Sequence, residues 1–104
     1  MITSLQNPLI KRLVALRDKT DRDRKQKFII EGRKEIGYAV EAGIVLEKLI
    51  VCPDIYSPST NTFQIERKTF QNVEWVEVSA QVYAKIAYRD KVEGLLALTR
   101  IPPK

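Results

Sequence analysis

The sequence contains no histidine, and Cys52 is its only cysteine. Without histidine the chain lacks the commonest general base and the commonest metal ligand. A single cysteine excludes an internal disulfide, and together with the missing histidine it nearly excludes a structural zinc site. The composition therefore favours neither a metal centre nor catalysis that depends on histidine.

Long apolar runs are also missing. No run approaches the ~18 apolar residues of a membrane-spanning helix. The N-terminus, MITSLQNPLIKR, has no extended apolar segment of the kind found in signal peptides. We therefore expect a cytoplasmic protein with no membrane partner. Its 104 residues, 44% of them apolar and 30% charged, suit one ordinary globular domain.

Positive charge is concentrated near the N-terminus. The chain has 18 Lys and Arg against 13 Asp and Glu, a net charge of +5. Eight cations and three anions lie between Pro8 and Lys27, so this quarter holds the whole excess. The cations are Lys11, Arg12, Arg17, Lys19, Arg22, Arg24, Lys25 and Lys27. RNA or DNA is a natural partner for such a cluster, and a solvated helix and turn that keep the protein soluble is the alternative.

Apolar spacing and turn residues predict helices that alternate with strands. Asn7 and Pro8 are typical of a helix start, and leucines at helical spacing continue the helix to about Lys19. Polar composition predicts a loop from Thr20 to Gln26, and 28–30 is expected to be a strand buried on both faces. The other predicted elements are helices over 33–42, 62–70 and after Ser79, and strands over 46–52, 73–78 and 95–101.

This alternation predicts an α/β fold. Strands joined through helices favour a mostly parallel central sheet, here of about four strands, with helices on both faces. We expect residues 1–101 to form one domain. The final Pro-Pro-Lys, 102–104, is typical of the start of a linker.

Several short motifs occur in an order that resembles one protein family. Their residues are Ser4, Asn7, Pro8 and Lys11 in the spacing S-x-x-N-P-x-x-K, Arg22 and Arg24 before Phe28-Ile29-Ile30-Glu31-Gly32, Val78-Ser79, and Gly94 before the last strand. The set resembles the substrate-binding domain of SpoU-type RNA 2′-O-ribose methyltransferases. The chain departs from the family at Gln26, where glycine is frequent, and at Val92, near a frequent proline.

The resemblance implies a fold, a partner and an architecture. The fold would be a three-layer α/β/α sandwich resembling kink-turn-binding ribosomal proteins, and the partner would be structured rRNA or tRNA. Methyl transfer would be carried out by a separate, knotted C-terminal domain that binds S-adenosylmethionine and is usually dimeric. We therefore expect no cofactor and no catalytic residue in this chain, whose full-length protein would be a homodimer through the domain it lacks.

Arginine offers a planar fork of donors that matches phosphate oxygens, so the basic segment supplies most of the candidate RNA-binding residues. The full set is Asn7, Lys11, Arg12, Arg22, Arg24, Lys25, Lys27, Glu31, Gly32, Arg33 and Arg89. Glu31 is expected to orient Arg22, Arg24 or Arg33 rather than to catalyse, and Gly32 to allow a tight turn.

We expect the basic loop to lie beside the end of the 28–30 strand, at one rim of the sheet. Two other functions remain open: a stand-alone RNA-binding protein of ribosomal type, and a protein-docking domain with a basic face.

Overall fold

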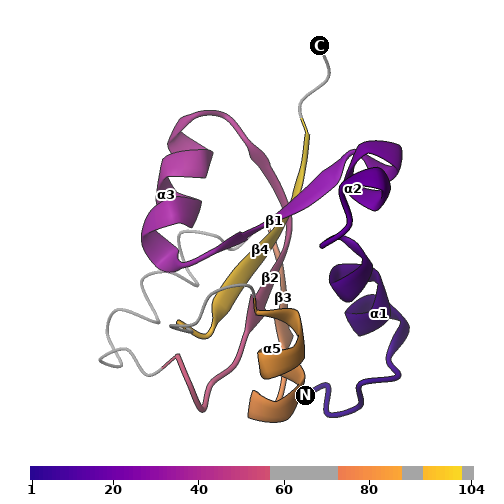
Figure 1. Cartoon of the computed structure of the whole chain (residues 1–104). Helices are drawn as coiled ribbons and strands as arrows, with labels where there is room; N and C mark the ends of the chain where they lie inside the picture. The colour runs from indigo at the N-terminus through magenta and orange to yellow at the C-terminus, as the bar shows by residue number, and fades with distance from the viewer. Residues whose placement is uncertain (57–72, 88–92, 102–104) are drawn as a thin grey trace.

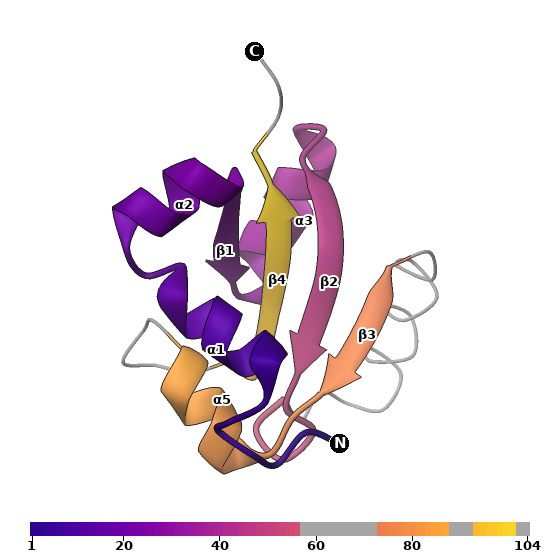
Figure 2. The ribbon, with the colours of Figure 1, turned by 90° about the vertical axis from the view of Figure 1, so that its right-hand side faces the viewer.

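Helices cover both faces of a four-stranded sheet in the computed structural model, which describes residues 1–56, 73–87 and 93–101 (Figures 1 and 2). This arrangement confirms the predicted α/β fold. The elements are α1 (Pro8–Ala15), α2 (Lys19–Lys25), β1 (Lys27–Glu31), α3 (Arg33–Glu41), β2 (Val45–Val51), β3 (Glu74–Glu77), α5 (Ala80–Ile86) and β4 (Leu95–Arg100).

The sheet is mixed, so the prediction of a mostly parallel sheet was wrong. Its order is β1-β4-β2-β3; β4 runs antiparallel to both β1 and β2, and β2 and β3 are parallel. The last strand, β4, begins near the end of the sheet where β3 finishes, so it runs opposite to β2 and β3 (Figure 2).

Two apolar layers separate the sheet from its helices. On one face α1 and α5 pack against β2 and β4, through Ile10, Leu13, Val82, Leu96 and Leu98. On the other face Ile36 of α3 packs against alternate residues of the same two strands. The edge strand β1 is half-buried over Lys27 to Ile30 rather than buried on both faces, because β4 is its one partner strand in the described sheet.

Three predicted helix boundaries are confirmed. Asn7 Oδ1 accepts a hydrogen bond from the Leu9 N–H at 2.9 Å, and Ser79 Oγ accepts one from the Val82 N–H at 3.2 Å. Gly43, with a φ of +87°, ends α3, and the Ile44 N–H donates back to the carbonyl of Ala39 at 2.9 Å. The sequence therefore located these helix ends correctly.

The segment predicted as a loop from Thr20 to Gln26 is mostly the helix α2. The first helix ends at Ala15, and Asp18 caps the second, because its side chain accepts a hydrogen bond from the Thr20 N–H at 2.8 Å. The pair Lys19–Asp23, four residues apart and 3.3 Å between charged atoms, supports the helix. No residue of α2 is buried, so apolar spacing could not indicate this helix.

Some predictions fall outside the described residues. These are the helix over 62–70, the linker start at 102–104 and the candidate residue Arg89. Among the residues that are described, no helix is long and apolar enough to cross a membrane. The same residues contain no cluster of three or more Cys, Asp or Glu side chains suited to a metal ion.

Candidate nucleic-acid interface

One side of the molecule carries most of the predicted cations on consecutive elements. Helix α1 carries Lys11 and Arg12, α2 carries Arg24 and Lys25, and β1 begins at Lys27. Because α2 follows α1 directly and leads into β1, the three elements lie next to one another (Figure 2). We call this side the α1–α2 surface. The fold therefore places the elements that carry these five cations side by side, with Asn7 at the start of α1.

Two arginines of the basic segment hold helix ends together. The Arg22 guanidinium donates to the carbonyls of Leu16 at 3.0 Å and Arg17 at 2.7 Å, where α1 has just ended. Arg17 donates in turn to the carbonyls of Lys85 at 2.7 Å and Ala87 at 2.8 Å, at the end of α5. Cations at these C-termini satisfy carbonyls that have no partner within the helix. Arg22 therefore has a structural role, whatever else it binds.

The remaining cations differ in how far they are already paired. Arg24 forms an ion pair with Asp21 at 2.6 Å. Within the described residues, the exposed side chains of Lys11, Arg12 and Lys25 form no ion pair and no hydrogen bond. These three charges are therefore available to an external anion without the loss of an internal contact.

Glu31 is buried and belongs to the packing of the sheet against α5. Its Oε2 accepts a hydrogen bond from the Tyr83 hydroxyl at 3.0 Å. Burial raises the pKa of Tyr83 far above its ordinary value, and the negative charge of Glu31 and this hydrogen bond raise it further. Of the three arginines that Glu31 was expected to orient, Arg22 binds main-chain carbonyls and Arg24 binds Asp21, so Arg33 is the remaining candidate.

Glu31, Gly32 and Arg33 lie at the far end of β1 from α2. The five residues of β1 span roughly 13 Å at about 3.3 Å per residue. The expectation that the basic segment and Glu31-Gly32-Arg33 share one rim was therefore wrong, since α2 precedes the strand that Glu31 ends. Gly32 does make the predicted tight turn, with a φ of +105°. The Arg33 N–H donates to Glu93 Oε2 at 3.2 Å.

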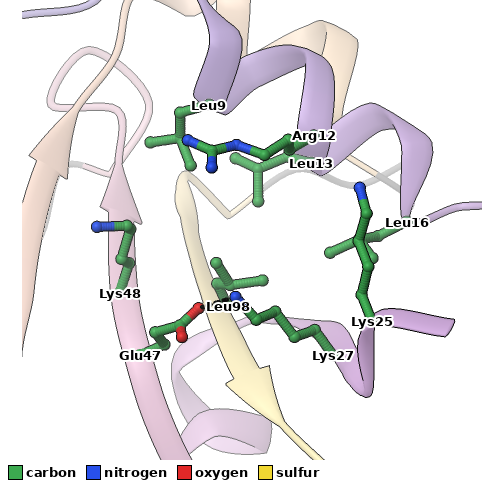
Figure 3. A pocket seen from close by; sticks show the side chains of 9 residues that line it. All are labelled: Leu9, Arg12, Leu13, Leu16, Lys25, Lys27, Glu47, Lys48 and Leu98. Atoms are coloured by element: carbon green, nitrogen blue, oxygen red, sulfur yellow. Dashed lines mark ion pairs between the residues drawn. The ribbon is translucent and has the colours of Figure 1, made fainter. Parts of the chain in front are cut away.

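A cavity of about 70 Å³ lies between α1 and the sheet, beside the α1–α2 surface (Figure 3). Its lining has an apolar part of four leucines and a charged rim of four cations and one carboxylate. The leucines are Leu9, Leu13, Leu16 and Leu98, and the charged residues are Arg12, Lys25, Lys27, Lys48 and Glu47. The sequence prediction included three of these cations, and it missed Lys48 and the leucine floor.

A β-bulge in β2 places Glu47 and Lys48 on the same face of the sheet. Leu46 pairs with Thr99 and Lys48 with Leu98, so Glu47 is an extra residue between two regular pairs. Both side chains consequently reach the cavity (Figure 3). The sequence signal was two successive charged residues inside the otherwise apolar strand LEKLIVC.

Ion pairs fix one side of this rim. Glu47 Oε2 lies 3.0 Å from Lys27 Nζ, and Glu47 Oε1 accepts from Arg100 Nε at 3.1 Å. Burial on its own would raise the pKa of Glu47, but the hydrogen bonds from Lys27 and Arg100 outweigh it and lower the pKa. Lys48 forms an ion pair with Glu74 of the neighbouring strand β3.

The cavity does not fit S-adenosylmethionine. Pockets for ligands of that size measure about 300–1,000 Å³, several times more than the space beside α1. Its rim is cationic, and it would repel the positively charged sulfonium of this cofactor. An anion is the complementary ligand.

Residues 7–97 match the family model of the MRM3-like substrate binding domain. The chain belongs to this family. The match confirms the predicted resemblance to the substrate-binding domains of SpoU-type RNA methyltransferases. No curated protein sequence matches the domain.

Solved structures of RNA methyltransferases resemble the domain. An RNA 2′-O ribose methyltransferase is 38% identical to it with a TM-score of 0.82, over 97% of this chain and 37% of that protein. The AdoMet-bound rRNA methyltransferase from Sinorhizobium meliloti is 26% identical with a TM-score of 0.75, over 99% of this chain and 37% of that protein. The SpoU methyltransferase AviRb from Streptomyces viridochromogenes shares the fold. It is 18% identical with a TM-score of 0.70, over 92% of this chain and 34% of that protein. The substrate-binding domain therefore spans little more than a third of these relatives.

Proposed function

We propose that this chain is the RNA-recognition domain of an S-adenosylmethionine-dependent RNA 2′-O-ribose methyltransferase. It holds structured rRNA or tRNA while a downstream knotted domain, beyond residues 1–101, methylates a ribose 2′-hydroxyl. Family membership supports the recognition role, and the methyltransferases with solved structures support the reaction. In this proposal the enzyme acts in the cytoplasm as a homodimer that forms through the downstream domain.

The observation that carries the proposal is the set of available cations on the α1–α2 surface. Lys11, Arg12 and Lys25 are exposed and form no ion pair within the described residues, and Lys27 begins the strand beside them. RNA presents phosphates at high density, and binding releases its condensed counterions. Such a surface binds structured RNA through its backbone, which positions the RNA without specifying its sequence.

The course of β4 supports a downstream catalytic domain that acts on RNA bound at this surface. The strand ends with Arg100 paired to Lys27, and the Ile101 N–H donates to the Gln26 carbonyl at 2.9 Å. Residue 101 therefore lies beside the C-terminal end of α2. A domain joined there lies close to RNA that is held by α1 and α2.

Salt dependence of RNA affinity tests the proposal. If about five phosphates are contacted, log affinity for a tRNA or rRNA transcript falls with log salt at a slope near −3.5 to −4.5. We expect the double variant Arg12→Gln/Lys25→Gln to weaken binding and to reduce the magnitude of that slope by roughly 1.5, because two phosphate contacts are lost. Fluorescence anisotropy at several salt concentrations measures both quantities.

The matched control is Lys34→Gln/Lys85→Gln, which removes the same net charge from exposed positions on α3 and α5. It should leave the slope almost unchanged. Equal effects of the two double variants would mean that only net charge matters, and would count against an RNA interface on the α1–α2 surface. Tight binding of an acidic protein that RNA does not displace would favour the protein-docking function instead.

A further inference from the structure

We propose that the cavity between α1 and the sheet binds the unpaired base of one RNA nucleotide, while Arg12 and Lys25 hold its phosphate. This inference rests on the proposed function, because it names the part of the RNA that the α1–α2 surface recognises. It goes further by assigning a base-binding subsite to residues that include Leu9, Lys48 and Glu47.

The floor of the cavity suits the face of a base. Leu13, Leu16 and Leu98 are buried, and Leu9 is half-buried at the edge of the same space. Their side chains come from α1 and β4 and converge in Figure 3. A planar, weakly polar ring gains contact with apolar side chains there. A phosphate or an ion alone would leave this apolar surface unused.

The rim suits the backbone of the same nucleotide. Lys27 and Lys48 are held by Glu47 and Glu74, so one side of the rim is fixed. Arg12 and Lys25 form no ion pair within the described residues, and their long stems can move without breaking one. These two cations can therefore turn toward a phosphate without breaking an ion pair and expose the leucines that line the cavity.

The size of the cavity selects one ring rather than a helix or a large cofactor. The cavity of about 70 Å³ is well above the roughly 10–15 Å³ needed to hold one water and well below the size of a cofactor pocket, so a single ring is the larger group that suits it. Bases inside a duplex are stacked and paired, and their faces cannot enter. Loops and bulges offer unstacked bases, which proteins commonly bind on apolar, aromatic or guanidinium surfaces.

The first experiment changes the RNA and leaves the protein intact. Three RNAs with the same number of phosphates are compared: a hairpin with an all-uridine loop, the same hairpin with an abasic loop, and a fully paired duplex. Fluorescence anisotropy measures their affinities for the chain at one fixed salt concentration. We expect the uridine hairpin to bind about tenfold more tightly than the abasic hairpin, since a bound base commonly contributes a factor of this order.

The second experiment fills the cavity. Leu9→Trp places an indole at its edge, and Leu5→Trp, at an exposed position before α1, is the matched control. We expect Leu9→Trp to bring the uridine hairpin down to the affinity of the abasic hairpin and to leave duplex binding unchanged. Leu5→Trp should keep the difference between the two hairpins. Circular dichroism melting checks that each variant is folded, and the abasic comparison stands if one of them is not.

The outcomes separate this inference from the proposed function. Equal affinity of wild-type protein for the uridine and abasic hairpins would overturn the base-binding subsite and leave RNA recognition standing. An equal loss for hairpin and duplex in folded Leu9→Trp would also overturn it, because the cavity would then have no specific role. If wild-type protein binds none of the three RNAs, both the subsite and the proposed function fail.

Discussion

At the scale of single residues, two glycines share a backbone conformation but not their surroundings. Gly43 has a φ of +87° and Gly94 a φ of +86°. A Cβ on Gly43 would meet no atom within 4 Å, whereas one on Gly94 would lie 2.5 Å from the backbone nitrogen of Tyr56. Substituting each glycine in turn therefore separates two contributions to the free energy of unfolding: the strain of a left-handed backbone, present at both positions, and a steric clash, present only at Gly94.

We expect Gly94→Ala to lower the free energy of unfolding by at least about 3 kcal/mol, because a backbone clash adds to the backbone strain. Gly43→Ala should lower it by about 1–2 kcal/mol, from strain alone. Urea unfolding followed by circular dichroism measures both values. Equal losses in the two variants would show that the packing of Gly94 against Tyr56 adds nothing.

A second residue-scale prediction concerns Tyr83 and pH. Because burial and Glu31 raise the pKa of Tyr83 in the folded protein, the unfolded chain loses this proton first, near its ordinary pKa of about 10. The stability that Tyr83 contributes is thus complete below about pH 10. It falls as the pH rises above that value, by up to roughly 1.4 kcal/mol per pH unit.

The variant Tyr83→Phe tests this linkage. It should be about 1–3 kcal/mol less stable than wild type at neutral pH, because Glu31 loses a buried hydrogen-bond donor. The gap between the two proteins should narrow as the pH rises above 10, since phenylalanine has no proton to lose. Urea unfolding from pH 7 to 11 measures the gap, and a constant gap across this range would contradict the coupling between Tyr83 and Glu31.

At the scale of elements, α2 ends on a conformation that suits glycine better than glutamine. Gln26 has a φ of +56°, and its side-chain amide donates to the Asp23 carbonyl at 2.5 Å. Gln26→Gly and Gln26→Ala both remove this bond, so their difference reports the backbone strain alone. We expect the glycine variant to be about 1 kcal/mol more stable than the alanine variant in urea unfolding. Equal stability would mean that the left-handed cap of α2 is not strained.

The same helix shows where sequence patterns fail. Asn7, Gly43 and Ser79 were identified as helix boundaries because each acts through its own backbone or its nearest neighbours. Helix α2 was missed because it buries nothing, although Asp18 carried the sequence signal of an N-cap. Local chemistry was thus predictable, and a helix without an apolar face was not.

At the scale of the whole molecule, the sequence predicted the layers but not the order and directions of the strands. Apolar spacing indicates which residues are buried, and it does not say which strand lies beside which. The cation cluster was predicted, yet its separation from Glu31-Gly32-Arg33 depends on β1 lying between them. The cavity was missed for the same reason: α1, β2 and β4 meet there from positions far apart in the sequence, and a bulge adds Glu47.

The central position of β4 has a consequence for how the chain folds as it is synthesised. In the described sheet β4 is the one partner strand of β1 and joins it to the pair of β2 and β3, and the hydrogen bond from Thr99 to the Phe28 carbonyl spans 71 residues. Translation delivers β4 after every other described strand. Until it arrives, β1 has no neighbour among the described strands, and α1 and α3 lack the β4 side chains against which they pack. We therefore expect the nascent domain to complete its core only once β4 is available, and slow closure of such distant contacts to limit its folding rate.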